Sequence, residues 1–121
     1  MWIMTKDGFF SVVQKGCPDG DVCVRARSKE HLETLLNKVD HMAHLRGIVE
    51  SEETDYRFRT WLSKKEFATY MKGEINAIDY DNFKNTIDTK THEGRARYTA
   101  FTEIWEIMYH YGYLINNKIR K

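Results

Sequence analysis

The segment from Val22 to Arg27 constrains the fold more than any other part of the chain, because apolar side chains occupy every second position in it. Successive side chains of a β-strand point to opposite faces of a sheet. The two valines and the alanine therefore share one face, while Cys23, Arg25 and Arg27 share the other. A strand of this kind needs neighbouring strands and a layer that covers its apolar face.

Neighbouring strands are predicted on both sides of this segment. Residues 2–5 and 9–14 are short apolar, β-branched or aromatic runs, and the Asp7-Gly8 step between them is typical of a tight hairpin turn. Residues 56–62 alternate again, and residues 48–49 are expected to begin a further strand. The acidic residues between these two segments predict a turn.

Two helices are predicted from apolar residues at helical spacing. The first begins at Ser28, a good N-cap, runs to Leu45 and is closed by Gly47. The second follows Ser63, whose capping box with Glu66 marks its start. Its inward face is expected to carry Phe67, Tyr70, Met71, Ile75 and Ile78.

The C-terminal third is expected to be helical as well. Asp79 is placed to cap a short helix with Phe83 and Ile87 inward, and residues 88–94 are polar and predict a loop. The last helix is expected to stop at Gly112. Its broad apolar face consists of Tyr98, Phe101, Ile104, Trp105, Met108 and Tyr109.

Strands that come first and helices that follow predict an α+β fold rather than a parallel α/β fold. We expect an antiparallel sheet of four or five strands that starts with the N-terminal hairpin, with three or four helices packed on it. The 121 residues contain no internal repeat or linker, so a single domain over residues 1–121 is expected. A chain of this length buries roughly two thirds of its unfolded surface, which is enough for a core without metals or disulfides.

Composition limits the partners and the compartment. The net charge is +1, so attraction to nucleic acid must come from local clusters of charge. No apolar run approaches the ~20 residues of a membrane span and no signal-peptide pattern is present, so a cytoplasmic protein without a membrane partner is expected. Cys17 and Cys23 match neither a zinc site nor a redox pair, and both are expected to be reduced, with a disulfide as the alternative.

The candidate binding residues are Arg25, Arg27, Arg57, Arg59 and Trp61. In residues 56–62, the arginines and the tryptophan are expected on the face opposite Tyr56, Phe58 and Leu62. If both alternating segments belong to one sheet, all four arginines share a face.

Such a face suits a phosphate-bearing ligand or single-stranded nucleic acid, because guanidinium groups bind phosphate bidentately and aromatic rings stack on bases. The alternative is structural: the arginines pair with acids such as Glu50, Glu52 or Asp55, or extend over a solvated sheet.

Candidate catalytic residues are few. His92 precedes Arg95 and Arg97 in an expected loop, a setting that suits acid–base work on a phosphate ester, so a small phosphodiesterase or nuclease is one alternative function. His41 and His44 could begin a metal site, but no further ligands are apparent, so surface histidines and no metal are expected. No cofactor motif is present, and no cofactor is predicted.

The last helix is rich in aromatic residues beyond its core face. Trp105, Tyr109, Tyr111 and Tyr113 are either packed in the core with incidental exposure, or they anchor an interface with a protein partner or a second copy of the chain. A protein–protein interaction or inhibitor function through this helix is the second alternative.

Several short motifs are spread over most of the chain: Met1-Trp2, Gly8-Phe9-Phe10-Ser11-Val12-Val13, Val24-Arg25-Ala26-Arg27, Asp55-Tyr56-Arg57 and Ile78-Asp79-Tyr80-Asp81-Asn82-Phe83-Lys84. In these motifs the sequence resembles a group of small uncharacterised bacterial and phage proteins. The resemblance implies a compact single-domain protein and transfers no catalytic residue, cofactor or partner.

No complete catalytic constellation accompanies these features. We therefore expect a non-enzymatic binding module that acts through the arginine and aromatic face of its sheet.

Overall fold

The computed structural model describes residues 1–39 and 47–117. The chain divides into two compact units, Met1–Asp79 and Tyr80–Lys121. Among the described residues, the first unit holds all the strands and two α-helices, and the second holds a short 3-10 helix and one long α-helix. The expected single domain over residues 1–121 stays a prediction.

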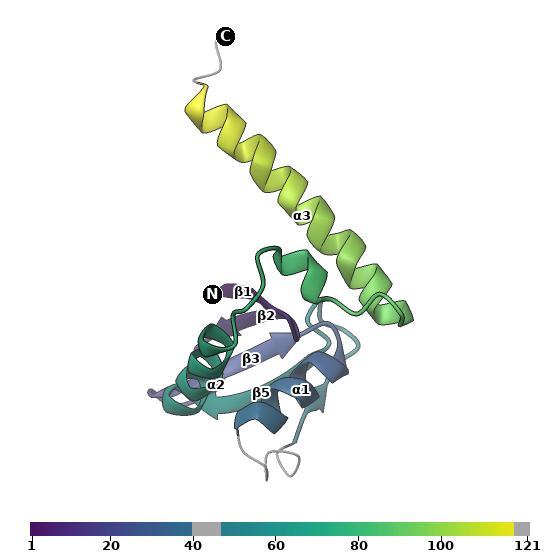
Figure 1. Cartoon of the computed structure of the whole chain (residues 1–121). Helices are drawn as coiled ribbons and strands as arrows, with labels where there is room; N and C mark the ends of the chain where they lie inside the picture. The colour runs from purple at the N-terminus through teal and green to yellow at the C-terminus, as the bar shows by residue number, and fades with distance from the viewer. Residues whose placement is uncertain (40–46, 118–121) are drawn as a thin grey trace. The chain divides into compact units, whose positions relative to one another are not determined.

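The first unit is built on a five-stranded sheet (Figure 1). Its strands are β1 (Trp2–Thr5), β2 (Gly8–Val13), β3 (Asp21–Ala26), β4 (Val49–Glu50) and β5 (Phe58–Ser63). Neighbouring strands run antiparallel in the order β1-β2-β3-β5-β4. The α+β fold, with an antiparallel sheet that starts with an N-terminal hairpin, is therefore confirmed.

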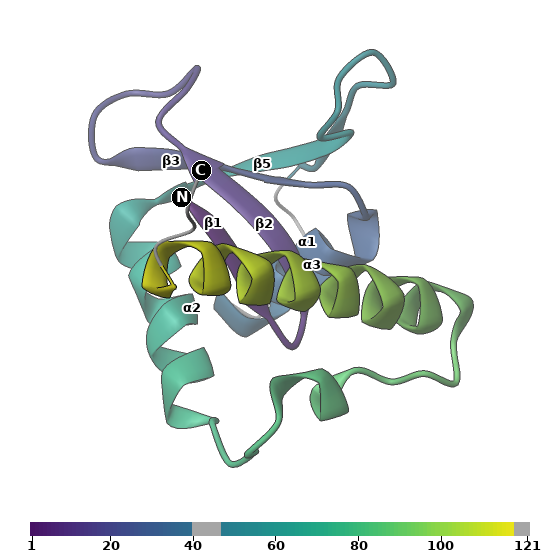
Figure 2. The same cartoon turned by 90° about the horizontal axis from the view of Figure 1, so that it is seen from above.

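Helices α1 (Lys29–Val39) and α2 (Lys64–Asn76) cover one face of this sheet (Figures 1 and 2). The strand residues beneath them are those that the alternation predicts to face inward. The core between the two layers consists of Phe10, Val12, Val24, Ala26, Leu32, Leu35, Leu36, Leu62, Phe67 and Tyr70. Because burial of one large apolar side chain stabilises a fold by ~1.5–3 kcal/mol, this layer supplies most of the stability of the unit.

A closed set of hydrogen bonds fixes the β1–β2 turn to α2. The Tyr70 hydroxyl donates to Asp7 Oδ2 at 2.8 Å and lies 2.7 Å from Thr5 Oγ1. The Asp7 backbone amide donates to the same Thr5 oxygen at 3.1 Å. Lys38 of α1 pairs with both Asp7 and Glu74, at 2.8 and 3.1 Å. The hairpin turn is thus held by a polar network that reaches both helices.

Glycine is required at the start of β2. The side chain of His31, which is buried in the first turn of α1, lies so close to Gly8 that an added Cβ would overlap its ring. Gly8 also has a φ of +153°, which side chains rarely adopt. The close approach brings α1 against the N-terminal hairpin.

Strand β5 continues into α2 without a loop. Ser63 is the last residue of β5 and the N-cap of α2, and its hydroxyl accepts from the Glu66 amide at 3.0 Å. The Glu66 carboxylate accepts from the Ser63 amide at 2.9 Å, which completes the predicted capping box.

The second unit consists of the 3-10 helix η2 (Phe83–Thr86) and helix α3 (His92–Asn116). Phe83 stacks on Phe101 with ring centroids 5.9 Å apart, and Phe101 and Ile87 are buried. A Cβ at Gly94 would overlap the backbone of Asp88, so the N-terminal turn of α3 packs closely on the chain that precedes it. The N-terminal half of α3 is therefore anchored within its own unit.

Several predicted helix boundaries and inward faces differ from the structure. The described part of α1 ends at Val39, and its predicted continuation to Leu45 lies outside the described residues. Ile75 and Ile78 are exposed rather than inward, because α2 ends at Asn76, at the margin of the core. Asn82, not Asp79, caps the short helix before Ile87.

The predicted end of the last helix is also wrong. Helix α3 runs through Gly112 to Asn116, because the cost of a single interior glycine is only ~1 kcal/mol, which is too little to end a 25-residue helix. The helix begins at His92, with Thr91 as its N-cap, so His92 lies in a helical turn and not in a loop.

Candidate functional site

The register of the sheet brings three of the five candidate residues onto one face. Arg25 of β3 lies directly opposite Arg59 of β5, and Cys23 lies opposite Trp61. On the other side of β3, Ser11 of β2 lies opposite Arg25. Directly opposed residues of an antiparallel pair share a face, so these side chains lie on the side of the sheet away from α1 and α2.

Arg27 joins this group just beyond the end of β3. Its guanidinium carbon lies 5.7 Å from the ring centroid of Phe9 and 4.3 Å from that of Tyr56. Arg25 lies over the same tyrosine ring at 4.7 Å. We refer to Arg25, Arg27, Arg59 and Tyr56 as the arginine cluster.

Tyr56 lies on the opposite face from the one predicted. The alternation placed it with Phe58 and Leu62, but β5 begins only at Phe58. Tyr56 belongs to the preceding turn, where strand periodicity does not act, and its ring turns towards the two arginines of β3. Sequence reasoning missed this contact, although an aromatic residue two positions before the strand is a weak signal for it.

Arg57 does not join the cluster. Its guanidinium pairs with Glu50 at 2.7 Å and with Glu52 at 2.8 Å, and it lies over the ring of Phe58. Glu50 is the register partner of Phe58, a residue of the opposite face. Like Tyr56, Arg57 precedes β5, so the alternation of the strand does not determine its direction.

Arg27 is compensated by a carboxylate. Its Nε and Nη2 donate to the two oxygens of Asp55 at 3.1 and 2.8 Å. This bidentate hydrogen bond raises the pKa of Arg27 and lowers the pKa of Asp55. Arg27 and Arg57 therefore pair with carboxylates, as the structural alternative in the sequence analysis expected.

Arg25 and Arg59 differ from the other two arginines. Arg25 Nη2 donates to Ser11 Oγ at 2.6 Å, and Arg59 Nη2 donates to Thr54 Oγ1 and to the Tyr56 carbonyl at 3.1 and 3.2 Å. Neither has a carboxylate partner in the described part of the chain, and the buried Nε atom of each has no acceptor there. Two like charges therefore face each other across the β3–β5 pair, and neither forms an ion pair with a carboxylate among the described residues, although the charge of Arg25 contributes to the lowered pKa of Asp55.

The electrostatics of a neighbouring thiol reflect this excess of positive charge. Burial raises the pKa of Cys23, while the charges of Arg59 and Arg25 act in the opposite direction. Both Cys23 and Cys17 are free thiols.

Trp61 is tied to the loop between β2 and β3. Its indole Nε1 donates to the Lys15 carbonyl at 3.2 Å, and its ring is half-buried beside Cys23. Further along the same face, Trp2 and Phe9 form a tilted aromatic pair with centroids 6.3 Å apart. Aromatic rings thus flank the arginines along the sheet.

The arginines near His92 are engaged within their own segment. Arg95 donates to the carbonyls of Thr89 and Lys90, both at 3.2 Å, and Arg97 pairs with Glu93 one helical turn earlier at 3.1 Å. These contacts close the turn at the start of α3, and a phosphodiesterase function around the exposed His92 stays a prediction.

Metal ligands do not gather within residues 1–39 and 47–117, where no group of three or more His, Cys, Asp or Glu side chains could hold an ion. His41 and His44 lie outside the described residues.

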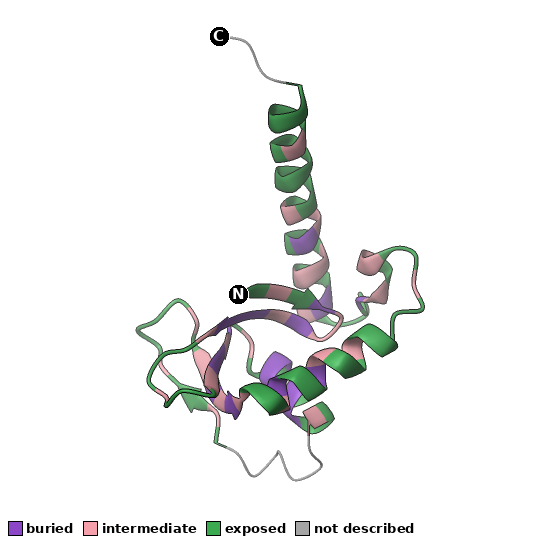
Figure 3. Ribbon diagram, turned by 90° about the vertical axis from the view of Figure 1, so that its left-hand side faces the viewer, coloured by how far each residue is buried: buried purple, intermediate pink, exposed green. Residues whose placement is uncertain are grey.

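The aromatic residues of α3 lie at the surface. Trp105, Tyr109, Tyr111 and Tyr113 are between 51% and 66% exposed, and Met108, predicted to be inward, is 56% exposed. Figure 3 shows buried positions on α3 only towards its N-terminal end, whereas they are frequent in the sheet. Trp105 and Tyr109 stack on each other at 5.5 Å. In the second unit, core packing thus ends at the level of Phe101.

Comparison of the chain with models of known protein families, with curated proteins and with solved structures finds no match. Among the described helices, none combines the length and the apolar character needed to cross a lipid bilayer.

Proposed function

We propose that this protein is a non-enzymatic binding module that takes a phosphate-bearing ligand, with single-stranded nucleic acid as the macromolecular form, on the arginine cluster. The observation that carries the proposal is the pair of Arg25 and Arg59, which face each other on the sheet face away from α1 and α2 and form no ion pair with a carboxylate in the described part of the chain. We place this function in the cytoplasm, in keeping with two free cysteines.

The charge balance supports an anionic ligand. Directly opposed like charges destabilise a sheet, and a buried donor without an acceptor costs ~1–3 kcal/mol. An anion bound beside Arg25 and Arg59 would offset the repulsion between the two positive charges, because guanidinium groups form charge-assisted hydrogen bonds with phosphate. Arg27 and Arg57 need no such partner, since carboxylates already neutralise them.

The surroundings favour phosphate attached to a base over a bare anion. Tyr56 holds two guanidinium groups over its ring, and Trp61, Phe9 and Trp2 lie on the same face. Single-strand binding sites combine cations for the backbone with aromatic rings for the bases, and each stacked base contributes ~1–3 kcal/mol.

The test is a titration of the whole protein with a fluorescently labelled single-stranded oligonucleotide at two salt concentrations. Binding should weaken with salt, and Arg59→Ala should weaken it further and reduce the log–log salt slope by about 0.7 for each phosphate that the substitution leaves unbound. Lys72→Ala, which removes one positive charge from the exposed surface of α2, is the matched control and should leave the slope unchanged.

Two results would contradict this function. One is the absence of binding at low salt. The other is an equal loss of affinity in Arg59→Ala and Lys72→Ala, because binding would then depend on the net charge of the protein and not on the arginine cluster. Competition with inorganic phosphate separates a simple anion site from one that also stacks bases, since only the second leaves the oligonucleotide bound.

A further inference from the structure

We propose that Asp55 is an internal competitor of the ligand: its carboxylate occupies Arg27 in the free protein and leaves when a second phosphate of the ligand binds there. This inference rests on the proposed function and deepens it. It makes a chain of at least two phosphate groups the ligand class of the arginine cluster.

The contact between Arg27 and Asp55 has the geometry of a phosphate contact. Arg27 Nε and Nη2 donate to the two carboxylate oxygens of Asp55 at 3.1 and 2.8 Å. Guanidinium groups bind phosphate through the same kind of parallel pair of hydrogen bonds. Asp55 therefore occupies the donors of Arg27 that a phosphate would use.

Asp55 can leave this position at little cost. Its side chain is 70% exposed and that of Arg27 is 52% exposed. Ion pairs at the surface contribute little to stability, because water and salt screen them. In the described part of the chain, Arg27 is the only hydrogen-bond and ion-pair partner of the Asp55 side chain. The carboxylate therefore exchanges Arg27 for water without the loss of another contact.

Arg27 keeps other contacts when Asp55 leaves. Its guanidinium carbon lies 4.3 Å from the ring centroid of Tyr56 and 5.7 Å from that of Phe9. The attraction between a cation and an aromatic ring does not require the carboxylate. The arginine is thus pre-positioned for an anion, which reduces the entropic cost of binding one.

Arg27 lies beside the position of the first phosphate. Arg25, which carries the proposed function together with Arg59, lies over the same Tyr56 ring at 4.7 Å. A phosphate bound at Arg25 and Arg59 therefore has Arg27 as its neighbour, and only a ligand with a further phosphate fills both positions. Single-stranded nucleic acid carries such a phosphate at each nucleotide, whereas a mononucleotide with one phosphate group does not.

Arg57 does not offer the same exchange. It pairs with two carboxylates, those of Glu50 and Glu52, at 2.7 and 2.8 Å. Glu50 is the register partner of Phe58, a residue of the opposite sheet face. A phosphate at Arg57 would have to displace both acids and would lie away from Arg25. The exchange therefore concerns Arg27 alone of the two paired arginines.

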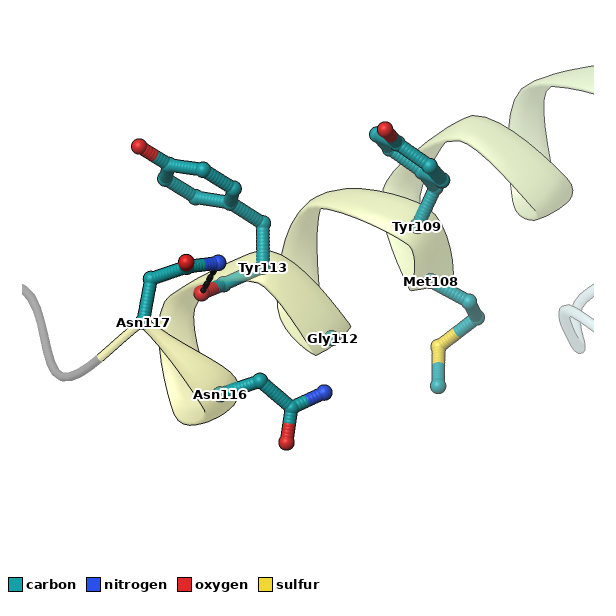
Figure 4. A pocket seen from close by; sticks show the side chains of 6 residues that line it. All are labelled: Met108, Tyr109, Gly112, Tyr113, Asn116 and Asn117. Atoms are coloured by element: carbon teal, nitrogen blue, oxygen red, sulfur yellow. Dashed lines mark hydrogen bonds between the residues drawn. The ribbon is translucent and has the colours of Figure 1, made fainter.

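The hollow on α3 is not a second phosphate position. It has a volume of about 320 Å³ and is lined by Met108, Tyr109, Gly112, Tyr113, Asn116 and Asn117 (Figure 4). None of these residues carries a positive charge, so none offers the charge-assisted hydrogen bonds that a guanidinium forms with phosphate. Both phosphate positions belong to the arginine cluster.

The test measures the dissociation constant of the full chain for a single-stranded oligothymidylate of about ten nucleotides, a length within the usual site sizes. Asp55→Asn keeps the size of the side chain and removes its charge, so it frees Arg27. We expect it to tighten binding by about threefold to fivefold. Circular dichroism should show the same secondary structure in both chains.

Glu53→Gln is the matched control. It removes the same charge from an exposed side chain of the same turn, and Glu53 forms no ion pair with an arginine of the described residues. Its effect on the dissociation constant should stay below about twofold, because salt screens exposed charges that are not in contact.

Two comparisons locate the gain. In an Arg27→Ala chain, Asp55→Asn should add no more than Glu53→Gln does, since the carboxylate then has no arginine to release. With thymidine monophosphate in place of the oligonucleotide, Asp55→Asn and Glu53→Gln should act alike, because Arg25 and Arg59 already bind a single phosphate.

Four outcomes overturn the inference. Equal oligonucleotide affinity of Asp55→Asn and the wild type removes Asp55 as a competitor and leaves the proposed function standing. A gain that persists in the Arg27→Ala chain excludes Arg27 as the released group. A gain of the same size for thymidine monophosphate excludes the second phosphate. If neither the wild type nor Asp55→Asn binds the oligonucleotide at low salt, the proposed function is wrong and this inference with it.

Discussion

Helices α1 and α3 use their apolar side chains in opposite ways. The 11 residues of α1 include four buried ones, among them Leu32, Leu35 and Leu36 beneath the sheet. The 25 residues of α3 include only two, Gly94 and Phe101, although the helix carries more large apolar side chains. The apolar residues of α1 recur on one face of the helix, whereas those of α3 are distributed around it. The number of apolar side chains in a helix therefore does not show how many of them are buried. The apolar residues of α1 stabilise the fold of the first unit, whereas most of the large apolar residues of α3 are exposed.

The sharpest test of this difference compares one leucine in each helix. Leu35→Ala should lower the free energy of unfolding by ~2–5 kcal/mol, because it leaves a cavity in a fully buried layer. Leu114→Ala should change it by less than ~0.5 kcal/mol, since this side chain is exposed. Urea denaturation at low protein concentration measures both values. Equal losses would mean that α3 is covered within the monomer.

Two glycines extend the comparison. Gly8→Ala should destabilise the first unit by ~1–3 kcal/mol, because the new methyl group overlaps the buried ring of His31. Gly112→Ala should instead stabilise α3 by up to ~1 kcal/mol through helix propensity, as the site is open. Thermal melts followed by circular dichroism at low concentration should therefore shift in opposite directions. A loss of helix in Gly112→Ala would contradict the open site.

The polar network of Tyr70 gives a smaller effect with a distinctive pH dependence. Tyr70→Phe should cost ~1–2 kcal/mol, because it removes the hydrogen bonds to Thr5 and Asp7. Burial raises the pKa of Tyr70, so folding favours its neutral form. This contribution is complete below the ordinary tyrosine pKa of ~10 and is lost as the pH rises above it. Wild-type stability should thus fall more steeply at alkaline pH than that of Tyr70→Phe, and parallel pH profiles would contradict the assignment.

A small effect is also expected at Arg57. This residue is half-exposed, and its ion pairs with Glu50 and Glu52 lie at the surface. Arg57→Ala should therefore change the free energy of unfolding by no more than ~1 kcal/mol, and less at high salt. A larger loss in urea denaturation would indicate that the β4–β5 turn depends on this arginine.

The sheet could be predicted because its signals are local. Alternation from Val22 to Ala26 and the Ser63–Glu66 capping box each act within a few residues, and both appear in the structure. The predicted N-terminal hairpin also forms, but its turn consists of Lys6 and Asp7, and Gly8 is the first residue of β2, paired with Thr5. The opposition of Arg25 and Arg59 followed from alternation once both strands paired.

The side-chain contacts that could not be predicted involve residues outside the regular helices and strands. Tyr56 and Arg57 precede β5, and the contacts of their side chains with Arg27 and Glu50 depend on the turn that joins β4 to β5. The choice of Asp55 as the partner of Arg27 also depends on that turn. For α3, the sequence analysis took Gly112 as the end of the helix, whereas the cost of one interior glycine is too small to end it.

The direct passage from β5 into α2 has a consequence for engineering the chain. One residue added after Ser63 would rotate α2 by about 100° about its axis, so that Phe67 and Tyr70 would no longer face the sheet. The hydrogen bond from Tyr70 to Asp7, which holds the β1–β2 turn, would then be lost. Tags or grafted peptides are better inserted near Gly16 in the loop between β2 and β3, where exposed backbone can lengthen without altering any helix phase.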